Sequence, residues 1–399
     1  MNPSAAKKMP APLLLDLSHT CHTRARTGIQ RVTRALLAAL GGRAQAITHD
    51  PHLKGWRELE SWERANLAAD NPSAQRGAQW PLGARARSLI RRGLGHNTPP
   101  LPENTGLIVP EVFSPEVARA LPTLFARTRG PRIALFHDAI ALKFPELTPA
   151  KTVARFPPYL VELLAFDGIA AVSGDSRDAL LDYWSWLGIV RPPPVQAIPL
   201  GVDCPPMAPT GAAPSGELPV VLSVGSIEGR KNHGALLEAC ESLWAGGVQF
   251  SLHLIGLAHP TTGAAALARI RALQAAGRPL RYDGPVSDVD IEAAYAACTF
   301  TVYPSLAEGF GLPVIESLAH GKPCICSARG ALGETSREGG CLALNSVAAP
   351  ALGAALARLL ASPTEVAALA AAARTRRFRN WAAFADDLTA WMRELPPPQ

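Results

Sequence analysis

Short apolar segments alternate with longer Ala- and Leu-rich segments along most of this 399-residue chain. The short segments have the composition of buried β-strands, and the longer ones repeat apolar residues with the period of an amphipathic helix. Such alternation predicts parallel sheets, because each helix returns the chain to the edge from which the next strand starts. We therefore expect α/β architecture with helices on both faces of each sheet. The expected strands are 12–17, 106–110, 132–136, 168–172, 195–199, 220–224, 250–255, 280–283 and 299–303, and the expected helices are 28–40, 115–126, 153–166, 176–187, 233–244, 263–276, 291–297 and 312–320.

A proline-rich segment interrupts the alternation near the middle of the chain. Nine prolines occur from Pro192 to Pro219, with little hydrophobic periodicity between them. The chain is also long for one hydrophobic core and natural for two. We therefore expect an N-terminal Rossmann-like domain at 1–205 and a C-terminal one at 206–376, and we expect a last helix within 377–399 to pack back on the N-terminal domain.

Composition restricts the class of protein. The sequence contains no stretch of 18 strongly apolar residues, so it predicts no membrane span. The N-terminus shows no signal-peptide pattern. The seven cysteines include no Cys-x-x-Cys pair and most lie in apolar runs, which fits reduced core residues. These features together predict a cytoplasmic protein.

The net charge of +6 comes mainly from arginine. This excess reflects either the base composition of the gene or an anionic partner, such as a phosphorylated substrate or a membrane surface. Aromatic residues are not interleaved with the basic ones as they are on RNA-binding surfaces, so we expect no nucleic-acid partner.

An Arg–Lys pair follows the strand expected at 220–224. The segment SVGSIEGRKNH (223–233) passes through a glycine turn to Arg230, Lys231 and Asn232, an expected helix N-cap. An arginine fork, a lysine point charge and the free N–H groups of a helix start suit a pyrophosphate. The pair also fits a solvated basic loop, although its place at a strand end favours a site.

A second strand end places two carboxylates around a glycine-rich helix start. The segment SLAEGFGLPVIESLAHGKPC (305–324) has Glu308 in the loop and Glu316 on the expected helix. The loop glycines allow the backbone to approach a ligand closely, and the N–H groups near Leu312 suit phosphate oxygens. Glu308 would then face a sugar-like group and Glu316 a vicinal diol. For Glu316 alone, an acidic residue favourably placed near a helix N-terminus is an equally good interpretation.

These two segments together resemble a known family. GSIEGRKN followed by YPSLAEGFGLPVIE is similar to the retaining glycosyltransferases of family 4, whose mark is two glutamates separated by seven residues, here Glu308 and Glu316. LLLDLSHT…TGIQRV and LFHDAIALKFPE resemble the subgroup that makes bacterial surface polysaccharides, often as mannosyl- or rhamnosyltransferases. The resemblance covers most of the chain and implies the GT-B fold, in which two doubly wound Rossmann-like domains face each other across a cleft. Gly229 departs from the subgroup, which usually has proline before the Arg–Lys pair, so we expect a more flexible loop.

The resemblance also implies a role for each matched residue. Arg230 and Lys231 would hold the donor diphosphate. Glu316 would bind the nucleotide ribose, Glu308 would contact the transferred sugar, and Val286 would lie near the base. The other implied donor contacts come from Gly225, Ser226, Gly309, Phe310, Gly311 and Leu312.

Strand ends in the first half supply further candidates. Gly28 opens a helix, where it either approaches the donor phosphate or acceptor or is an ordinary turn glycine, and Arg31 on the same helix is a weaker candidate. His137 ends a buried strand beside Asp138, which is able to orient its ring. A lone histidine is more often structural, but in the resembling enzymes one here contacts the sugar C6 hydroxyl or the acceptor. Ser173 has either an acceptor role or a helix-packing role.

Three other patterns have competing interpretations. Asp-Val-Asp at 288–290 matches a metal signature of another glycosyltransferase fold, but Ser287 before it favours a helix cap. The His and Cys residues of 19–22 have no second ligand pair at a spacing typical of zinc sites. The basic segment RARSLIRRGLG (85–95) either rests on anionic lipid head groups or is a solvated loop.

The sequence therefore predicts a retaining, metal-independent hexosyltransferase with Glu308, Arg230, Lys231 and His137 as catalytic candidates. We expect no cofactor, a GDP-mannose or GDP-rhamnose donor, and a growing or lipid-linked polysaccharide acceptor in bacterial surface glycan synthesis. We also expect the cytoplasmic protein to contact the inner face of the plasma membrane. The alternatives are a family 4 transferase using a UDP- or dTDP-sugar, and a catalytically silent sugar-nucleotide-binding scaffold.

Overall fold

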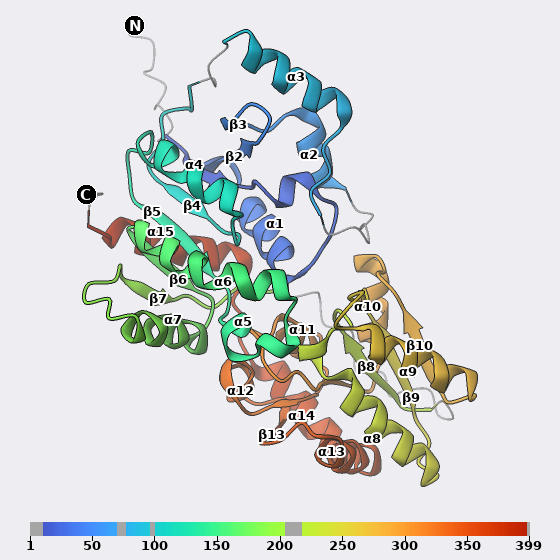
Figure 1. The fold of residues 1–399 in the computed structure, drawn as a ribbon. Helices are drawn as coiled ribbons and strands as arrows, with labels where there is room; N and C mark the ends of the chain where they lie inside the picture. Colours follow the sequence, from blue (N-terminus) through green and yellow to red (C-terminus); the bar gives the residue numbers. More distant parts are fainter. Residues whose placement is uncertain (1–10, 70–76, 96–99, 204–217, 397–399) are drawn as a thin grey trace, which may run out of the picture.

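A computed structural model describes residues 11–69, 77–95, 100–203 and 218–396, which form two α/β lobes (Figure 1). The predicted boundary at residue 205 lies outside the described residues. The N-terminal lobe contains a seven-stranded sheet in which the edge pair is antiparallel and all other pairs are parallel. In spatial order its strands are β3 (Gly55–Glu58), β2 (Ala44–Asp50), β1 (Leu13–Asp16), β4 (Leu107–Val109), β5 (Arg132–Phe136), β6 (Gly168–Ala171) and β7 (Val195–Ala197).

The C-terminal lobe contains a six-stranded, fully parallel sheet. In spatial order its strands are β10 (Leu280–Asp283), β9 (Ser251–Ile255), β8 (Val220–Val224), β11 (Phe300–Tyr303), β12 (Cys324–Ser327) and β13 (Cys341–Leu344). The strand order reverses between β1 and β4 in the first sheet and between β8 and β11 in the second. Ligands of doubly wound sheets bind beyond the carboxyl ends of the strands at such a switch point.

Helices cover both faces of each sheet, as predicted (Figure 1). Those of the N-terminal lobe are α1 (Gly28–Leu40), α2 (Ser61–Ala68), α3 (Leu82–Gly93), α4 (Pro115–Phe125), α5 (Ile140–Lys143), α6 (Ala150–Glu162) and α7 (Gly174–Trp186). The second half of the chain contributes α8 (His233–Ala245), α9 (Ala264–Ala275), α10 (Asp288–Ala297), α11 (Leu312–Ala319), α12 (Gly330–Ser336), α13 (Ala349–Ala361), α14 (Pro363–Thr375) and α15 (Trp381–Glu394).

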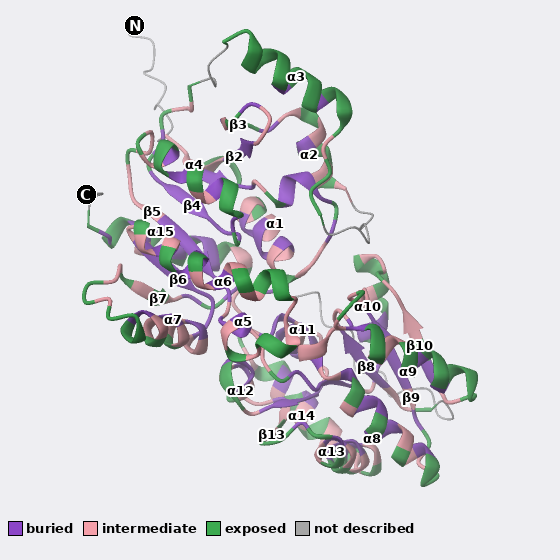
Figure 2. Ribbon diagram, in the orientation of Figure 1, coloured by how far each residue is buried: buried purple, intermediate pink, exposed green. Residues whose placement is uncertain are grey.

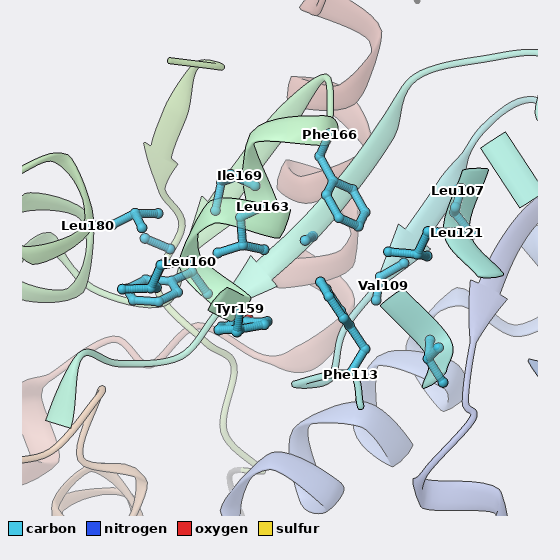
Figure 3. Close-up of a cluster of buried hydrophobic side chains, with 14 of the residues drawn as sticks. Leu107, Val109, Phe113, Leu121, Tyr159, Leu160, Leu163, Phe166, Ile169 and Leu180 are labelled. Carbon is cyan, nitrogen blue, oxygen red and sulfur yellow. The ribbon is translucent and has the colours of Figure 1, made fainter. Parts of the chain in front are cut away.

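The last helix, α15, belongs spatially to the N-terminal lobe (Figure 1). It contacts α1 and shares a buried cluster with strands of the first sheet. Gly168 of β6 lies directly beneath it, because a Cβ there would be 2.8 Å from side-chain atoms of Trp391 and Leu395. The opposite face of the sheet is filled by aromatic and aliphatic side chains that include Phe113, Tyr159 and Phe166 (Figure 3). Burial on both faces explains why the inner strands are almost continuously apolar (Figure 2).

Within the described residues, no single helix has the length and apolarity needed to cross a membrane. Only α13 and α14 together meet such a criterion, by length and composition alone, and they are bent by 97° at their junction.

Candidate active site

The two predicted donor-binding segments meet at the switch point of the C-terminal sheet. The chain leaves β8 through a glycine turn and enters a short 3-10 turn, Gly229–Lys231. The chain leaves β11 through the loop that carries Glu308 and enters α11. The N–H of Leu306 donates to the carbonyl of Arg230 at 2.9 Å, so a hydrogen bond joins the two segments.

Arg230, Lys231 and Glu308 form a compact group of charges, which we call the ion cluster. Lys231 Nζ donates to Glu308 Oε1 at 2.5 Å, and Arg230 Nη1 donates to Glu308 Oε2 at 2.6 Å. Arg230 Nη2 also pairs with Glu228 Oε1 at 2.8 Å. The Lys231 and Glu308 side chains are each 10% exposed, so these charges interact in a poorly solvated environment.

The pKa values of the ion cluster favour its ionised form. Burial alone would raise the pKa of Glu308, but the charges of Arg230 and Lys231 lower it to about 2. Burial, helped by Arg230, lowers the pKa of Lys231, and the Glu308 carboxylate opposes this shift. Glu308 is therefore a carboxylate at any ordinary pH, and the charge of Lys231 depends on it.

Glu316, the second glutamate of the motif, is not part of the ion cluster. Its carboxylate pairs with Arg31 of α1, which belongs to the other lobe. A second cross-lobe pair joins Arg26 to Asp288 at the start of α10. Asp290 and Ser287 form a capping box at the same helix start, as the helix-cap interpretation predicts.

The loop between Glu308 and α11 packs against the N-terminal lobe. A Cβ on Gly309 would lie 2.1 Å from the carbonyl oxygen of His137, so no larger residue fits without a shift. Ser173, the N-cap of α7, donates from Oγ to the Gly309 carbonyl at 2.7 Å. Across the same interface, Glu334 of α12 accepts from the N–H groups of Gly174 and Asp175 at the start of α7. Gly309 therefore provides contact between lobes in addition to the close ligand approach expected of it.

His137 is held in one tautomer. Its Nε2 lies 2.7 Å from the carbonyl oxygen of Pro110, and because a carbonyl only accepts, Nε2 must carry the proton. Burial lowers the pKa of His137, so the ring is neutral near pH 7. Its Nδ1 is therefore an acceptor, suited to a sugar hydroxyl.

The remaining predicted site residues occupy the expected strand ends and helix starts. Gly28 is exposed with open space around it, and Gly225 adopts a φ of +156° beside Lys231. Ser226 follows in the same turn, and Val286 packs against the apolar cluster next to β8 and β9. Gly311 is the N-cap of α11 with a φ of +96°. Leu312 begins that helix, and the carbonyl of Phe310 accepts from Thr335 at 3.0 Å.

The prediction that Asn232 caps α8 is wrong in its detail. Asn232 occupies the N-cap position in a left-handed conformation, but its side chain makes no capping hydrogen bond. Its Nδ2 instead donates to the carbonyls of Pro304 and Val347, at 3.2 and 2.8 Å. The residue thus ties the end of β11 to the loop before α13.

A cleft of about 600 Å³ opens beside the ion cluster and is lined by both lobes. Its walls include Lys143 from the N-terminal lobe, Ser327 and Asn345 from the ends of β12 and β13, and Glu308. Neither cation of the ion cluster lines it. None of the four residues of the two cross-lobe ion pairs lines this cleft.

Two acidic residues at the switch point of the N-terminal sheet were not predicted. Asp16 ends β1 and is 2% exposed, and Glu111 follows β4 and is 5% exposed. Glu111 accepts from the N–H groups of His19 and Thr20. Burial, helped by the charge of Glu111, raises the pKa of Asp16 to about 7 against hydrogen bonds from Ser18. The available signal was a carboxylate directly after the apolar run LLL.

Replacing Asp16 with asparagine is expected to stabilise the protein more at pH 8 than at pH 5. The unfolded pKa of an aspartate is about 3.9, whereas that of folded Asp16 is raised to about 7. The stability that this raised pKa contributes is complete below about pH 3.9 and is lost as pH rises to about 7. Asparagine does not titrate, so the Tm of Asp16→Asn relative to the wild type should be a few degrees higher at pH 8 than at pH 5. Thermal unfolding at both pH values measures it, with exposed Asp182→Asn as control. An advantage that does not change with pH would contradict the prediction.

Two groups of described residues bring potential metal ligands together. Cys21, His22 and Glu63 form one group, but both oxygens of Glu63 are hydrogen-bonded to Arg57, at 2.8 and 2.7 Å. A cation there would have to displace an arginine. The other group consists of Cys324, Cys326 and Cys341.

The family model described as glycosyl transferases group 1 matches residues 211–376. This chain carries a group 1 glycosyltransferase domain. The domain contains the whole ion cluster and α11.

The glycosyltransferase domain and the lobe before it also resemble curated proteins. The serotype-specific mannosyltransferase WbdA of Escherichia coli is 27% identical over 343 residues, covering 80% of this chain and 39% of the relative. The chain thus spans about two fifths of the length of this relative. The O-antigen chain mannosyltransferase B of Escherichia coli is 44% identical over 64 residues, covering 16% of this chain and 17% of the relative.

Solved structures identify the fold of the whole chain. Sucrose-phosphate synthase from Thermosynechococcus elongatus superposes with a TM-score of 0.68 at 21% identity, covering 96% of this chain and 98% of that one. The fold is GT-B, as the sequence predicts.

Proposed function

We propose that this protein is a retaining glycosyltransferase that moves a mannosyl or related hexosyl group from a nucleoside-diphosphate sugar to a glycan acceptor. The observation that carries the proposal is the ion cluster at the switch point of the C-terminal sheet, next to Gly309, which packs against the backbone of His137 across the lobe interface. A buried lysine and a partly buried arginine at one strand end fit a diphosphate, and a carboxylate between them fits a developing sugar cation. The mannosyltransferase relatives support mannose as the first sugar to test.

The chemical step is loss of the diphosphate from the anomeric carbon. As the bond between this carbon and the phosphate oxygen breaks, Arg230 and Lys231 stabilise the negative charge that grows on the leaving group. Glu308 orients the sugar and stabilises its positive charge. The acceptor hydroxyl bonds to the anomeric carbon from the same face, and its proton passes to a phosphate oxygen. These residues supply the charge stabilisation themselves, so we propose that the reaction is independent of metal ions and of any cofactor.

The acceptor is expected to approach from the N-terminal lobe. Asp16, Glu111 and His137 follow β1, β4 and β5, which surround the switch point of that sheet. Carboxyl groups and a neutral imidazole are suitable hydrogen-bond partners for sugar hydroxyls. We propose a growing or lipid-linked polysaccharide as the acceptor.

A product assay tests the function. The full chain is incubated with GDP-mannose, GDP-rhamnose, UDP-glucose and dTDP-rhamnose, and released nucleoside diphosphate and glycosylated acceptor are measured with and without EDTA. We expect turnover with a GDP-sugar, unaffected by EDTA, and the anomeric configuration of the donor in the product. Turnover of a UDP- or dTDP-sugar would identify the alternative donor class. Binding of donors without turnover would identify a non-catalytic scaffold.

Donor binding is expected to displace Arg31 from Glu316. If Glu316 accepts hydrogen bonds from the ribose, Arg31 competes with the nucleotide for it. Arg31→Met should therefore lower the donor Kd by about fivefold, since a partly exposed ion pair contributes about 1 kcal/mol. Isothermal titration with the donor measures this. Arg26→Met removes the other cross-lobe pair without touching Glu316 and should have a smaller effect. Weaker binding by Arg31→Met would contradict the competition.

Helix α3 is the proposed contact with an anionic membrane surface. It stands at the outer end of the N-terminal lobe, with most of its length exposed (Figure 2). At 100° per residue, the exposed Leu82, Leu89 and Ile90 fall on one side, opposite the buried Ala84 and Ser88. The helix thus presents its apolar stripe to solvent, flanked by Arg85 and Arg92 on one side and Arg87 on the other. This arrangement is typical of helices that lie in a lipid interface.

Glutamate at both Leu89 and Ile90 is expected to abolish binding to anionic vesicles. The two charges remove the apolar stripe and oppose the attraction of the arginines, so the vesicle-bound fraction should fall by about tenfold or more. Co-sedimentation with phosphatidylglycerol vesicles measures this, with phosphatidylcholine vesicles for comparison. Val190→Glu is the control, because this apolar residue is more exposed, at 89%, than Leu89 at 52% or Ile90 at 61%. Equal binding by the wild type to both kinds of vesicle would refute the role of charge.

A further inference from the structure

Three cysteines gather behind α11, outside the ion cluster. Cys324 and Cys326 point to the same face of β12, and Cys341 begins the parallel strand β13 in register with Cys324. The three Sγ atoms lie within 4.8 Å of one another. Cys324 and Cys326 are buried and Cys341 is partly exposed, so one side of the trio is open toward solvent.

The surroundings of the trio are apolar except for one arginine. Arg376 has a side chain only 6% exposed, and its Nη1 donates to the carbonyls of Thr335 and Gly339. Its Nη2 pairs with Glu338 at 3.3 Å. Its Nε is buried and has no hydrogen-bond partner among the residues that the structure describes. The apolar residues packed around the thiols are Tyr303, Val314, Leu318, Leu332 and Ala373.

The trio is prepared to hold negative charge. Hydrogen bonds from Cys324 and Cys326, together with the charge of Arg376, lower the pKa of Cys341 to about 4 against its burial. Burial raises the pKa of Cys324 well above its usual range.

The spacing of the sulfur atoms suits a tetrahedral metal ion. Zn²⁺ binds thiolates at about 2.3 Å, which sets the sulfur ligands about 3.8 Å apart. Sulfur atoms already within 4.8 Å of one another reach this distance by shifts of less than about 1 Å. Three thiolates around a divalent ion leave one negative charge, which the guanidinium of Arg376 is placed to balance.

We propose that Cys324, Cys326 and Cys341 bind a thiophilic divalent cation such as Zn²⁺, with the fourth position open to water on the side of Cys341. Metal ions bind thiolates and not thiols, so binding releases protons and affinity rises with pH. The ion links the edge strand β13 to β12 directly behind α11. The bound ion should stabilise the C-terminal lobe, and this effect does not depend on the proposed transferase activity.

The group formed by Cys21, His22 and Glu63 does not qualify as a second site. Its histidine Nε2 lies 2.8 Å from Glu63, whose carboxylate already holds Arg57. This group therefore serves as an internal comparison, because it contains one cysteine and two other potential ligands without an open coordination position.

Titration of the reduced, metal-free full chain with Co²⁺ tests the proposal. We expect one Co²⁺ per chain, a sulfur-to-cobalt charge-transfer absorption in the near ultraviolet, and its loss on addition of Zn²⁺. Cys326→Ser and Cys341→Ser should lose this absorption, whereas Cys21→Ser and the isolated core variant Cys240→Ser should keep it. Absence of the absorption in the wild type, or its persistence in Cys326→Ser and Cys341→Ser, would overturn the proposal.

A second measurement requires no variant to fold. Cys341 is the partly exposed member of the trio, so iodoacetamide should modify it in the metal-free protein. Zn²⁺ should slow this modification by about tenfold or more, because the bound thiolate is no longer free to react. Mass spectrometry of the Cys341 peptide gives the rate. An unchanged rate at saturating Zn²⁺ also overturns the site.

Discussion

Lys231→Met is expected to lower kcat by about 100- to 1000-fold with little effect on folding. Methionine keeps the length and apolar stem of lysine but removes the charge that the leaving diphosphate needs. Glu308 keeps its second cation, because Arg230 Nη1 remains within 2.6 Å. Steady-state kinetics with a donor identified in the product assay measures the loss, and near-normal turnover would remove Lys231 from the mechanism.

Controls for Lys231→Met separate the local charge from the general loss of a lysine. Lys151→Met changes an exposed lysine on α6 and should leave kcat unchanged. Arg230→Met should lower kcat by a similar factor, and the double variant by less than the product of the two. The two cations hold the same carboxylate and the same proposed leaving group, so their contributions are not independent. Fully multiplicative losses would show that the two cations act separately.

The sequence predicts the fold most accurately where a strand is buried on both faces. The expected limits of β5, β8 and α1 agree with the structure, because continuous apolar runs and a clear 3.6-residue period mark these elements. β2 and its antiparallel partner, the edge strand β3, were missed because they carry polar residues such as Thr48 and His49 in β2. β12 and β13 were missed because they are short and start with cysteine after glycine- or proline-containing turns.

The sequence likewise predicts some features of the candidate site and not others. The ion cluster was predictable because each half of it lies in one short segment, and the carboxyl ends of neighbouring parallel strands bring the halves together. The pairing of Glu316 with Arg31 joins residues 285 positions apart, and only the packing of the two lobes creates it. The contact of Gly309 with the carbonyl of His137 has the same origin. Local patterns therefore identify candidate binding residues, whereas their contacts with the other lobe emerge only from tertiary structure.

Glu308→Gln is expected to lower kcat by about 100-fold and to make donor binding depend on pH. Glutamine keeps the shape and one acceptor oxygen but removes the charge proposed to stabilise the sugar cation. It also removes the carboxylate that raises the pKa of Lys231, while burial and Arg230 continue to lower it. The lysine of the variant should therefore lose its proton as pH rises through a range in which the wild-type lysine stays charged.

The pH dependence distinguishes an electrostatic role of Glu308 from a purely structural one. At pH 6 the variant should bind the donor about as tightly as the wild type, with only kcat reduced, and at pH 9 its Kd should also rise. Titration calorimetry at both pH values, with circular dichroism to verify folding, gives this comparison. Exposed Glu238→Gln on α8 provides a control for loss of a surface carboxylate. If Glu308 only positioned Lys231 sterically, glutamine would preserve donor affinity at both pH values, because its amide fills the same space between the same two cations.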